Sequence, residues 1–197
     1  MMSNYVLIHG GNSNGQVWEK VANFLIANHH QIWTPTLLDE KTSTLTEHIA
    51  SICQLIESQN IKDVILVGHS YGGMVVTGIA NNLTRRINRL IYVDAAIPDN
   101  NQSLFEIINA TGLDAINHYH LDPYPPFITP ITFDSSLIKN IPKTFIFCQR
   151  SEFKSVTEAM SKKVLHNINN WTYFELNATH NPMQTAPFKL AQILMNN

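Results

Sequence analysis

Short apolar runs and amphipathic stretches alternate along most of the chain. Residues 5–9 and 64–67 are mainly apolar and rich in aliphatic side chains, a pattern typical of buried strands. Residues 16–28 instead carry apolar side chains every three or four positions, with Ser13 or Asn14 as the expected N-cap, which predicts a helix. Because such strands and helices alternate with short connections, we expect an α/β fold with a doubly wound, mostly parallel six-stranded sheet. The expected strands are residues 5–9, 31–34, 64–67, 90–93, 143–148 and 171–176, and the expected helices are residues 16–28, 44–58, 73–82, 155–166 and 187 to the end.

The stretch from Pro98 to Pro142 breaks this alternation. It is rich in proline and aromatic residues and contains one plausible helix near residues 103–110. A connection of this length in a compact domain is usually a lid or a binding loop, and its aromatic content argues against a disordered segment. We therefore expect one domain over residues 1–197, with a small cap at about residues 98–142.

Composition and charge exclude several classes of protein. With 197 residues and 44% hydrophobic content, the chain can build one sizeable core. A formal net charge of -2 provides no basic field, so neither nucleic acid nor an anionic membrane is an expected partner. No apolar run approaches the length of a membrane span, and the first residues lack a basic region and a long apolar region, so we expect neither a membrane span nor a signal peptide. The sequence leaves the oligomeric state open between monomer and homodimer.

The cysteines and histidines do not predict a disulfide framework or a metal site. Cys53 and Cys148 both lie in apolar runs, which is typical of buried free thiols in a reducing compartment, so we expect a cytoplasmic protein. His118 and His120 lack a third ligand nearby, and the nine histidines form no metal-binding motif. No metal and no other cofactor is expected.

The strongest candidate for chemistry is Gly68-His69-Ser70-Tyr71-Gly72. The pattern G-x-S-x-G alone is weak, since it arises by chance in roughly one 200-residue chain in fifteen. Here it follows a buried-strand run and precedes a small-residue stretch compatible with a helix, which is the setting of a nucleophile elbow. The alternative is a glycine-rich strand-to-helix turn with an inert serine.

With three further motifs, this chain resembles the α/β-hydrolase superfamily. Within it, the similarity is to the small esterases related to plant methylesterases and hydroxynitrile lyases, including their bacterial relatives. The resemblance implies a core lacking the two leading antiparallel strands, a reduced cap above the serine, and a triad in the order Ser70, Asp94, His180. The motifs are His9-Gly10-Gly11, Gly68 to Met74, Val93-Asp94-Ala95-Ala96-Ile97-Pro98 and Thr179-His180.

Each of these residues has an expected role in ester cleavage through an acyl-enzyme. Ser70 is the expected nucleophile, and His180, in a polar loop after the last strand, is the base that takes its proton. The amides of Tyr71 and Gly11 are expected to form the oxyanion hole. His9 and His69 are expected to fix loop geometry rather than titrate. The partner is then a small carboxylic ester, without a cofactor.

The acid of the triad has two candidates in the sequence. Most relatives carry an aspartate after the penultimate strand, but residues 148–153 contain none, which leaves Glu152 as a candidate. Asp94 instead ends the strand next to the elbow strand, in a context similar to that of some lipases, and it is our expected acid. The alternatives are that Asp94 only caps the lid loop through backbone amides, or that the site is a dyad without an acid.

Two other functions are compatible with the same scaffold. One is a hydroxynitrile lyase-type carbon–carbon lyase, and the other is a non-catalytic binder of small ligands. The lyases carry a threonine after the first-strand histidine and a lysine after the catalytic histidine, where this chain has Gly10 and Asn181. These two differences favour ester hydrolysis.

Overall fold

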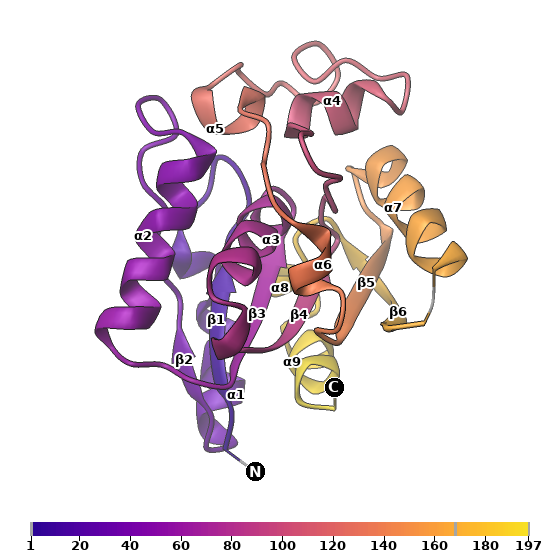
Figure 1. The fold of residues 1–197 in the computed structure, drawn as a ribbon. Helices are drawn as coiled ribbons and strands as arrows, with labels where there is room; N and C mark the ends of the chain where they lie inside the picture. Colours follow the sequence, from indigo (N-terminus) through magenta and orange to yellow (C-terminus); the bar gives the residue numbers. More distant parts are fainter. Residues whose placement is uncertain (1, 168, 197) are drawn as a thin grey trace.

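One parallel sheet organises the molecule (Figure 1). The computed structural model describes residues 2–167 and 169–196. Over these residues the sheet has six strands in the order β2-β1-β3-β4-β5-β6, and each neighbouring pair is parallel, so the predicted sheet is confirmed. The strands are β1 (Asn4–Ile8), β2 (Gln31–Trp33), β3 (Val64–His69), β4 (Ile87–Val93), β5 (Lys143–Arg150) and β6 (Trp171–Thr179).

Helices cover both faces of the sheet, as the alternating pattern predicts. The capping box of Thr44 and Glu47 begins the second long helix, because each side chain accepts the other residue's amide proton. The expected helix 16–28 instead starts as a 3-10 turn over Gly15–Trp18, capped by Asn14. The long helices are α1 (Glu19–Ala27), α2 (Leu45–Ser58), α3 (Gly72–Asn82), α7 (Lys154–His166) and α9 (Pro187–Met195), and one-turn α8 (Pro182–Thr185) precedes α9.

Alternating side chains of each strand divide the core into two layers. In β1, Tyr5 and Leu7 pack in the layer beneath α1 and α9, whereas Val6 and Ile8 pack in the layer beneath α2 and α3. Burying a large apolar side chain contributes roughly 1.5–3 kcal/mol, so these two layers stabilise the fold strongly. They also fix the register of the strands, whose carboxyl ends meet at one edge of the sheet.

The segment between β4 and β5 contains more structure than the sequence pattern indicated. The expected helix near residues 103–110 is present, and an isolated bridge between Gln102 and Ile131 joins the two ends of the excursion. The first two of its helices lie above the carboxyl edge of the sheet, while the third packs against α3 (Figure 1). These helices are α4 (Leu104–Asn109), α5 (Pro125–Ile128) and α6 (Ser135–Ile138).

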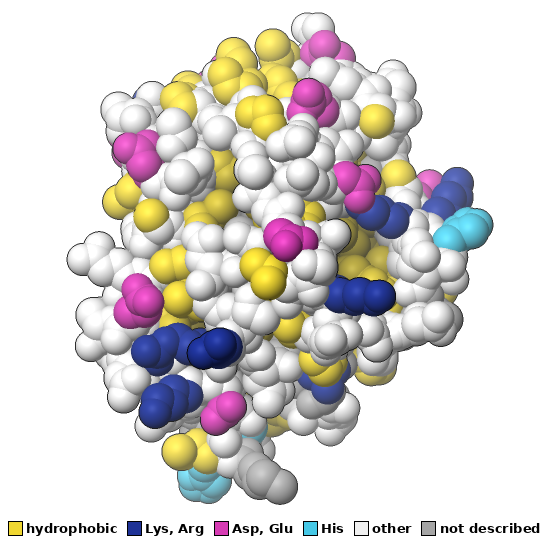
Figure 2. Space-filling model, in the orientation of Figure 1, with side chains coloured by type: hydrophobic (Ala, Val, Ile, Leu, Met, Phe, Trp, Pro, Cys, Tyr) yellow, Lys and Arg dark blue, Asp and Glu magenta, His cyan; other side chains and the backbone are white. Residues whose placement is uncertain are grey.

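Both cysteines of the chain lie among the described residues. Cys53 and Cys148 are free and buried, and burial raises the pKa of the Cys53 thiol to about 11. Across residues 2–167 and 169–196, no cluster of three metal-ligating side chains occurs, and no helix is long and apolar enough to cross a membrane. On the face drawn in Figure 2, acidic and basic side chains are interspersed, and hydrophobic ones gather over the part that contains α4 and α5.

Candidate active site

Ser70 stands on a strained turn between β3 and α3. Its backbone has φ of 54°, in the left-handed region that non-glycine residues rarely adopt, at a cost of about 1–3 kcal/mol. The turn is tight: a Cβ added to Gly68 would lie 2.5 Å from the carbonyl oxygen of Gly72. The Ser70 carbonyl accepts the amides of Gly73 and Ala96, both at 3.1 Å, which ties the turn to the segment that follows β4. This is the geometry expected of the elbow.

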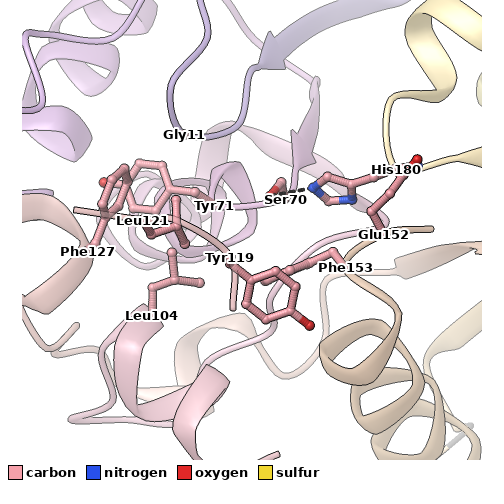
Figure 3. Close-up of a pocket in the computed structure, with 10 residues that line it drawn as sticks. All are labelled: Gly11, Ser70, Tyr71, Leu104, Tyr119, Leu121, Phe127, Glu152, Phe153 and His180. Atoms are coloured by element: carbon pink, nitrogen blue, oxygen red, sulfur yellow. Dashed lines mark hydrogen bonds between the residues drawn. The ribbon is translucent and has the colours of Figure 1, made fainter. Parts of the chain in front are cut away.

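His180 connects Ser70 to Asp94. The Nε2 atom of its imidazole lies 3.0 Å from Ser70 Oγ, and the Nδ1 atom lies 2.7 Å from Asp94 Oδ2. Figure 3 shows the ring directed at Ser70 from the loop that follows β6. The three residues predicted from three separate strand ends are therefore joined by one line of hydrogen bonds. A hydroxyl, an imidazole and a carboxylate in this order can pass a proton from the serine to the histidine.

Asp94 is held rigidly beneath the histidine. It is fully buried, has φ of 46°, and its amide donates to Ile146 O at 2.8 Å. Its Oδ1 accepts the backbone amide of Cys148 at 3.0 Å, and its Oδ2 accepts the hydroxyl of Ser151 and faces His180 Nδ1. A buried carboxylate is costly unless such donors surround it. The backbone amide that Asp94 accepts belongs to β5, not to the lid, which argues against the lid-capping alternative.

Glu152, the alternative acid, reaches a different part of the same histidine. Its Oε2 accepts the backbone amide of His180 at 2.9 Å. This hydrogen bond, followed by one from its own amide, holds the pKa of Glu152 below its ordinary value. Glu152 is exposed and bonds to the backbone of the loop, whereas Asp94 bonds to the imidazole.

Two further histidines fix the loops around the site. His69 is buried, and its Nε2 donates to the carbonyl oxygen of His180 at 2.6 Å. Burial, and then the proximity of His180, hold the pKa of His69 well below its ordinary value, so it stays neutral. His9 accepts the amide of Leu37 at 3.0 Å through Nε2, and burial lowers its pKa as well. These contacts agree with the expected positioning roles.

The predicted oxyanion-hole residues lie on the same cavity as Ser70. Gly11 and Tyr71 both line it (Figure 3). Across the described residues, neither backbone amide donates to a protein acceptor. Tyr71 immediately precedes α3, where helix amides and the helix dipole favour negative charge. Gly10 must lack a side chain, because a Cβ there would lie 2.9 Å from Ser70 Cβ. The two predicted residues therefore border the same cavity as Ser70, close to the nucleophile.

The cavity is small and mainly apolar, with a volume of about 240 Å³. The excursion between β4 and β5 supplies much of its wall, and the remaining wall comes from the strand ends (Figure 3). Pockets that are mainly apolar with a few polar groups are typical of sites for small ligands. Its lining from the excursion is Leu104, Tyr119, Leu121 and Phe127.

Ser151 was missed by the sequence reasoning. It follows β5, donates its hydroxyl to Asp94, and lies 3.5 Å from His180 Nδ1 through its Oγ. The available signal was its position after the penultimate strand, next to Glu152, where a polar residue can reach the histidine loop. Serine is common in turns, so residue type alone could not distinguish this role from an ordinary one.

The sequence pattern of the "Alpha/beta hydrolase family" matches residues 5–147, well over half of the chain. The chain belongs to the α/β-hydrolase family. Its fold is also similar to the crystal structure of polyneuridine aldehyde esterase, with a TM-score of 0.82 at 19% identity over 100% of this chain and 99% of that one. An extracellular α/β-hydrolase from a Paenibacillus species gives a TM-score of 0.78 at 20% identity, over 98% of each chain.

Curated relatives of this α/β-hydrolase match over shorter stretches. A carbendazim hydrolyzing esterase of Nocardioides sp. is 38% identical over 115 residues, which cover 54% of this chain and 48% of the relative. Salicylic acid-binding protein 2 of Nicotiana tabacum is 31% identical over 107 residues, covering 48% of this chain and 40% of the relative. The chain therefore spans half or less of the length of these curated relatives.

Proposed function

We propose that this protein is a serine hydrolase that cleaves small carboxylic esters through an acyl-enzyme. The observation that carries the proposal is the line of hydrogen bonds from Asp94 through His180 to Ser70, at 2.7 and 3.0 Å. Ser70 is the nucleophile, His180 the general base and acid, and Asp94 the group that orients the imidazole. The amides of Tyr71 and Gly11 stabilise the oxyanion.

The reaction proceeds in two halves. Ser70 Oγ attacks the ester carbonyl carbon while His180 Nε2 takes the hydroxyl proton, and the carbonyl electrons move to the oxygen held by the two amides. When the tetrahedral intermediate collapses, the bond to the alcohol oxygen breaks and the imidazolium gives its proton to that oxygen. Water then attacks the acyl carbon while His180 accepts its proton. The bond from that carbon to Ser70 Oγ breaks, the carboxylic acid leaves, and His180 returns the proton to Ser70.

The walls of the cavity support a compact and largely uncharged substrate. The apolar side chains from residues 98–142 act as the cap of a single domain in this proposal, and they exclude water from the serine. Several relatives are named as esterases, which supports this reaction class. The two buried free cysteines support a cytoplasmic location, and the protein acts as a monomer or homodimer.

The carbon–carbon lyase reaction is less well supported by the residues next to the histidine. The residue that follows His180 is Asn181, so no fixed cation stands there to stabilise a departing cyanide. We expect hydrolysis of p-nitrophenyl acetate to exceed cleavage of mandelonitrile in kcat/KM. The opposite ranking would favour the lyase.

Labelling with a fluorophosphonate probe tests the proposal without knowledge of the natural substrate. The probe is expected to add its mass to the peptide that contains Ser70 and to leave Ser70→Ala unlabelled. Ser13→Ala, which changes an exposed serine of the loop after β1, serves as the control and should label like the unchanged protein. A folded protein that stays unlabelled would favour the ligand-binder alternative. If the protein is labelled, a panel of esters of graded chain length would define its substrate.

A further inference from the structure

Ser151 touches the acid of the proposed triad and is almost entirely enclosed. Only 7% of the residue is exposed, and its Oγ accepts the amide of Phe153 at 3.0 Å. The hydroxyl proton of Ser151 is thereby left to point at Asp94 Oδ2, because an ionised carboxylate can only accept. Both polar functions of Ser151 are therefore used within the protein.

The carboxylate of Asp94 has three donors, and Ser151 shares an oxygen with the imidazole. The amide of Cys148 donates to Oδ1, while Ser151 and His180 both approach Oδ2. Ser151 Oγ also lies 3.5 Å from His180 Nδ1. Asp94 Oδ2 is therefore held between the Ser151 hydroxyl and the His180 imidazole. A shift of that oxygen would change the direction of the imidazole and hence the approach of Nε2 to Ser70.

We propose that Ser151 is a positioning residue of the active site, which acts through Asp94 by fixing the oxygen that pairs with His180. The inference rests on the proposed serine hydrolase function. Ser151 does not line the cavity, so its contribution concerns the chemical step rather than substrate binding. Its hydroxyl also neutralises part of the carboxylate's charge, which moderates the attraction between Asp94 and a protonated His180.

Among the described residues, three other titratable groups contact or adjoin the residues of this pair. His69 lies against the ring of His180, with 4.7 Å between ring centroids, and is held neutral by burial. Glu152 bonds to the backbone of His180, and the Cys148 thiol is kept protonated because burial raises its pKa. A pH effect of changing Ser151 can thus be compared with these three groups.

The test uses Ser151→Ala and Ser151→Cys against Ser151→Thr. Alanine removes the hydroxyl, cysteine replaces it with a somewhat larger and weaker donor, and threonine keeps the donor. We expect Ser151→Ala and Ser151→Cys to lower kcat by about tenfold with little change in KM, because a hydrogen bond to a charged group is lost or weakened. Ser151→Thr should keep most of the wild-type kcat. Ser161→Ala is the matched control, since Ser161 is 8% exposed and donates to Tyr173, away from the site.

Two readouts separate positioning from a merely structural role. With one donor fewer on Asp94, the acidic limb of kcat/KM against pH should move upward by about half a unit in Ser151→Cys. In proton NMR, the resonance of the proton between His180 and Asp94 should shift in Ser151→Cys but not in Ser161→Ala, whether or not an ester is turned over. If wild-type protein is active and both readouts are unchanged in folded Ser151→Cys, the inference is wrong. An unlabelled, inactive wild type would contradict the proposed function, and the NMR shift would still decide the contact to Asp94.

Discussion

Asp94 and Glu152 are two carboxylates that bind the same histidine in different ways. Asp94 pairs with the imidazole of His180 at 2.7 Å, and Glu152 accepts the backbone amide of His180 at 2.9 Å. Asp94 is fully buried and has a left-handed backbone, whereas Glu152 is exposed. The difference teaches that a carboxylate's role follows from the atom it reaches: one can orient the ring, and the other can only hold the loop.

The largest effect is expected where the carboxylate meets the ring. Asp94→Asn keeps the shape but presents an amide, so the Nδ1–H of His180 loses its charged acceptor and the wrong tautomer is favoured. We expect kcat to fall by roughly 10³–10⁴ with folding intact, measured by ester hydrolysis and thermal unfolding. A fall of less than tenfold would show that Asp94 is not the acid.

A smaller effect is expected from the group that holds the other side of the loop. His69→Phe keeps an aromatic ring but removes the donor to the carbonyl oxygen of His180. Losing a hydrogen bond of about 0.5–1.5 kcal/mol should lower kcat by about three- to tenfold. His69→Gln, which retains a side-chain donor, is the matched variant, and its kcat should lie between those of His69→Phe and wild type. Equal activity of His69→Phe and wild type would show that His69 does not position the His180 loop for catalysis.

Glu152→Gln is expected to change activity least of the three. The amide oxygen of glutamine can still accept the backbone amide of His180, so the loop keeps its contact. We expect kcat to fall by less than about tenfold, because the interaction that is weakened lies at an exposed position. A larger loss than that of Asp94→Asn would transfer the role of the acid to Glu152.

The pH dependence of stability provides the finest comparison. The pKa of Glu152 is lowered in the folded protein by the amide of His180, so its contribution to stability is present above its ordinary value of 4.5. That contribution is lost as the pH falls through the lowered value. The difference in Tm between wild type and Glu152→Gln should therefore be present near neutral pH and disappear in acid. A difference that grows below pH 4.5 would contradict the assignment of this hydrogen bond.

The fold and the elbow could be predicted because their signals are local. The apolar run before Ser70 and the glycines around it predict the strand, the turn and the start of the helix within a few positions. The one-turn helices α5 and α6 escaped prediction because four residues are too few to show a helical period.

The choice between Asp94 and Glu152 needed information that no local pattern contains. It depends on how far β4 and β5 extend beside each other. It also depends on which atom of His180, 86 residues from Asp94 in the sequence, each carboxylate contacts. Ser151 was missed for the same reason, since its contact to Asp94 joins two strand ends. The catalytic roles of Ser70, His180 and Asp94, and those of Gly11 and Tyr71, stay predictions until they are measured.

The rate at which a fluorophosphonate labels Ser70 tests the division of roles between the two carboxylates most directly, because it needs no substrate. It should be measured in wild type, Asp94→Asn and Glu152→Gln, each shown to be folded. The account predicts that Glu152→Gln reacts within about tenfold of wild type and that Asp94→Asn reacts at least about a hundredfold more slowly than Glu152→Gln. Equal rates in the two variants, or the reverse order, would contradict it.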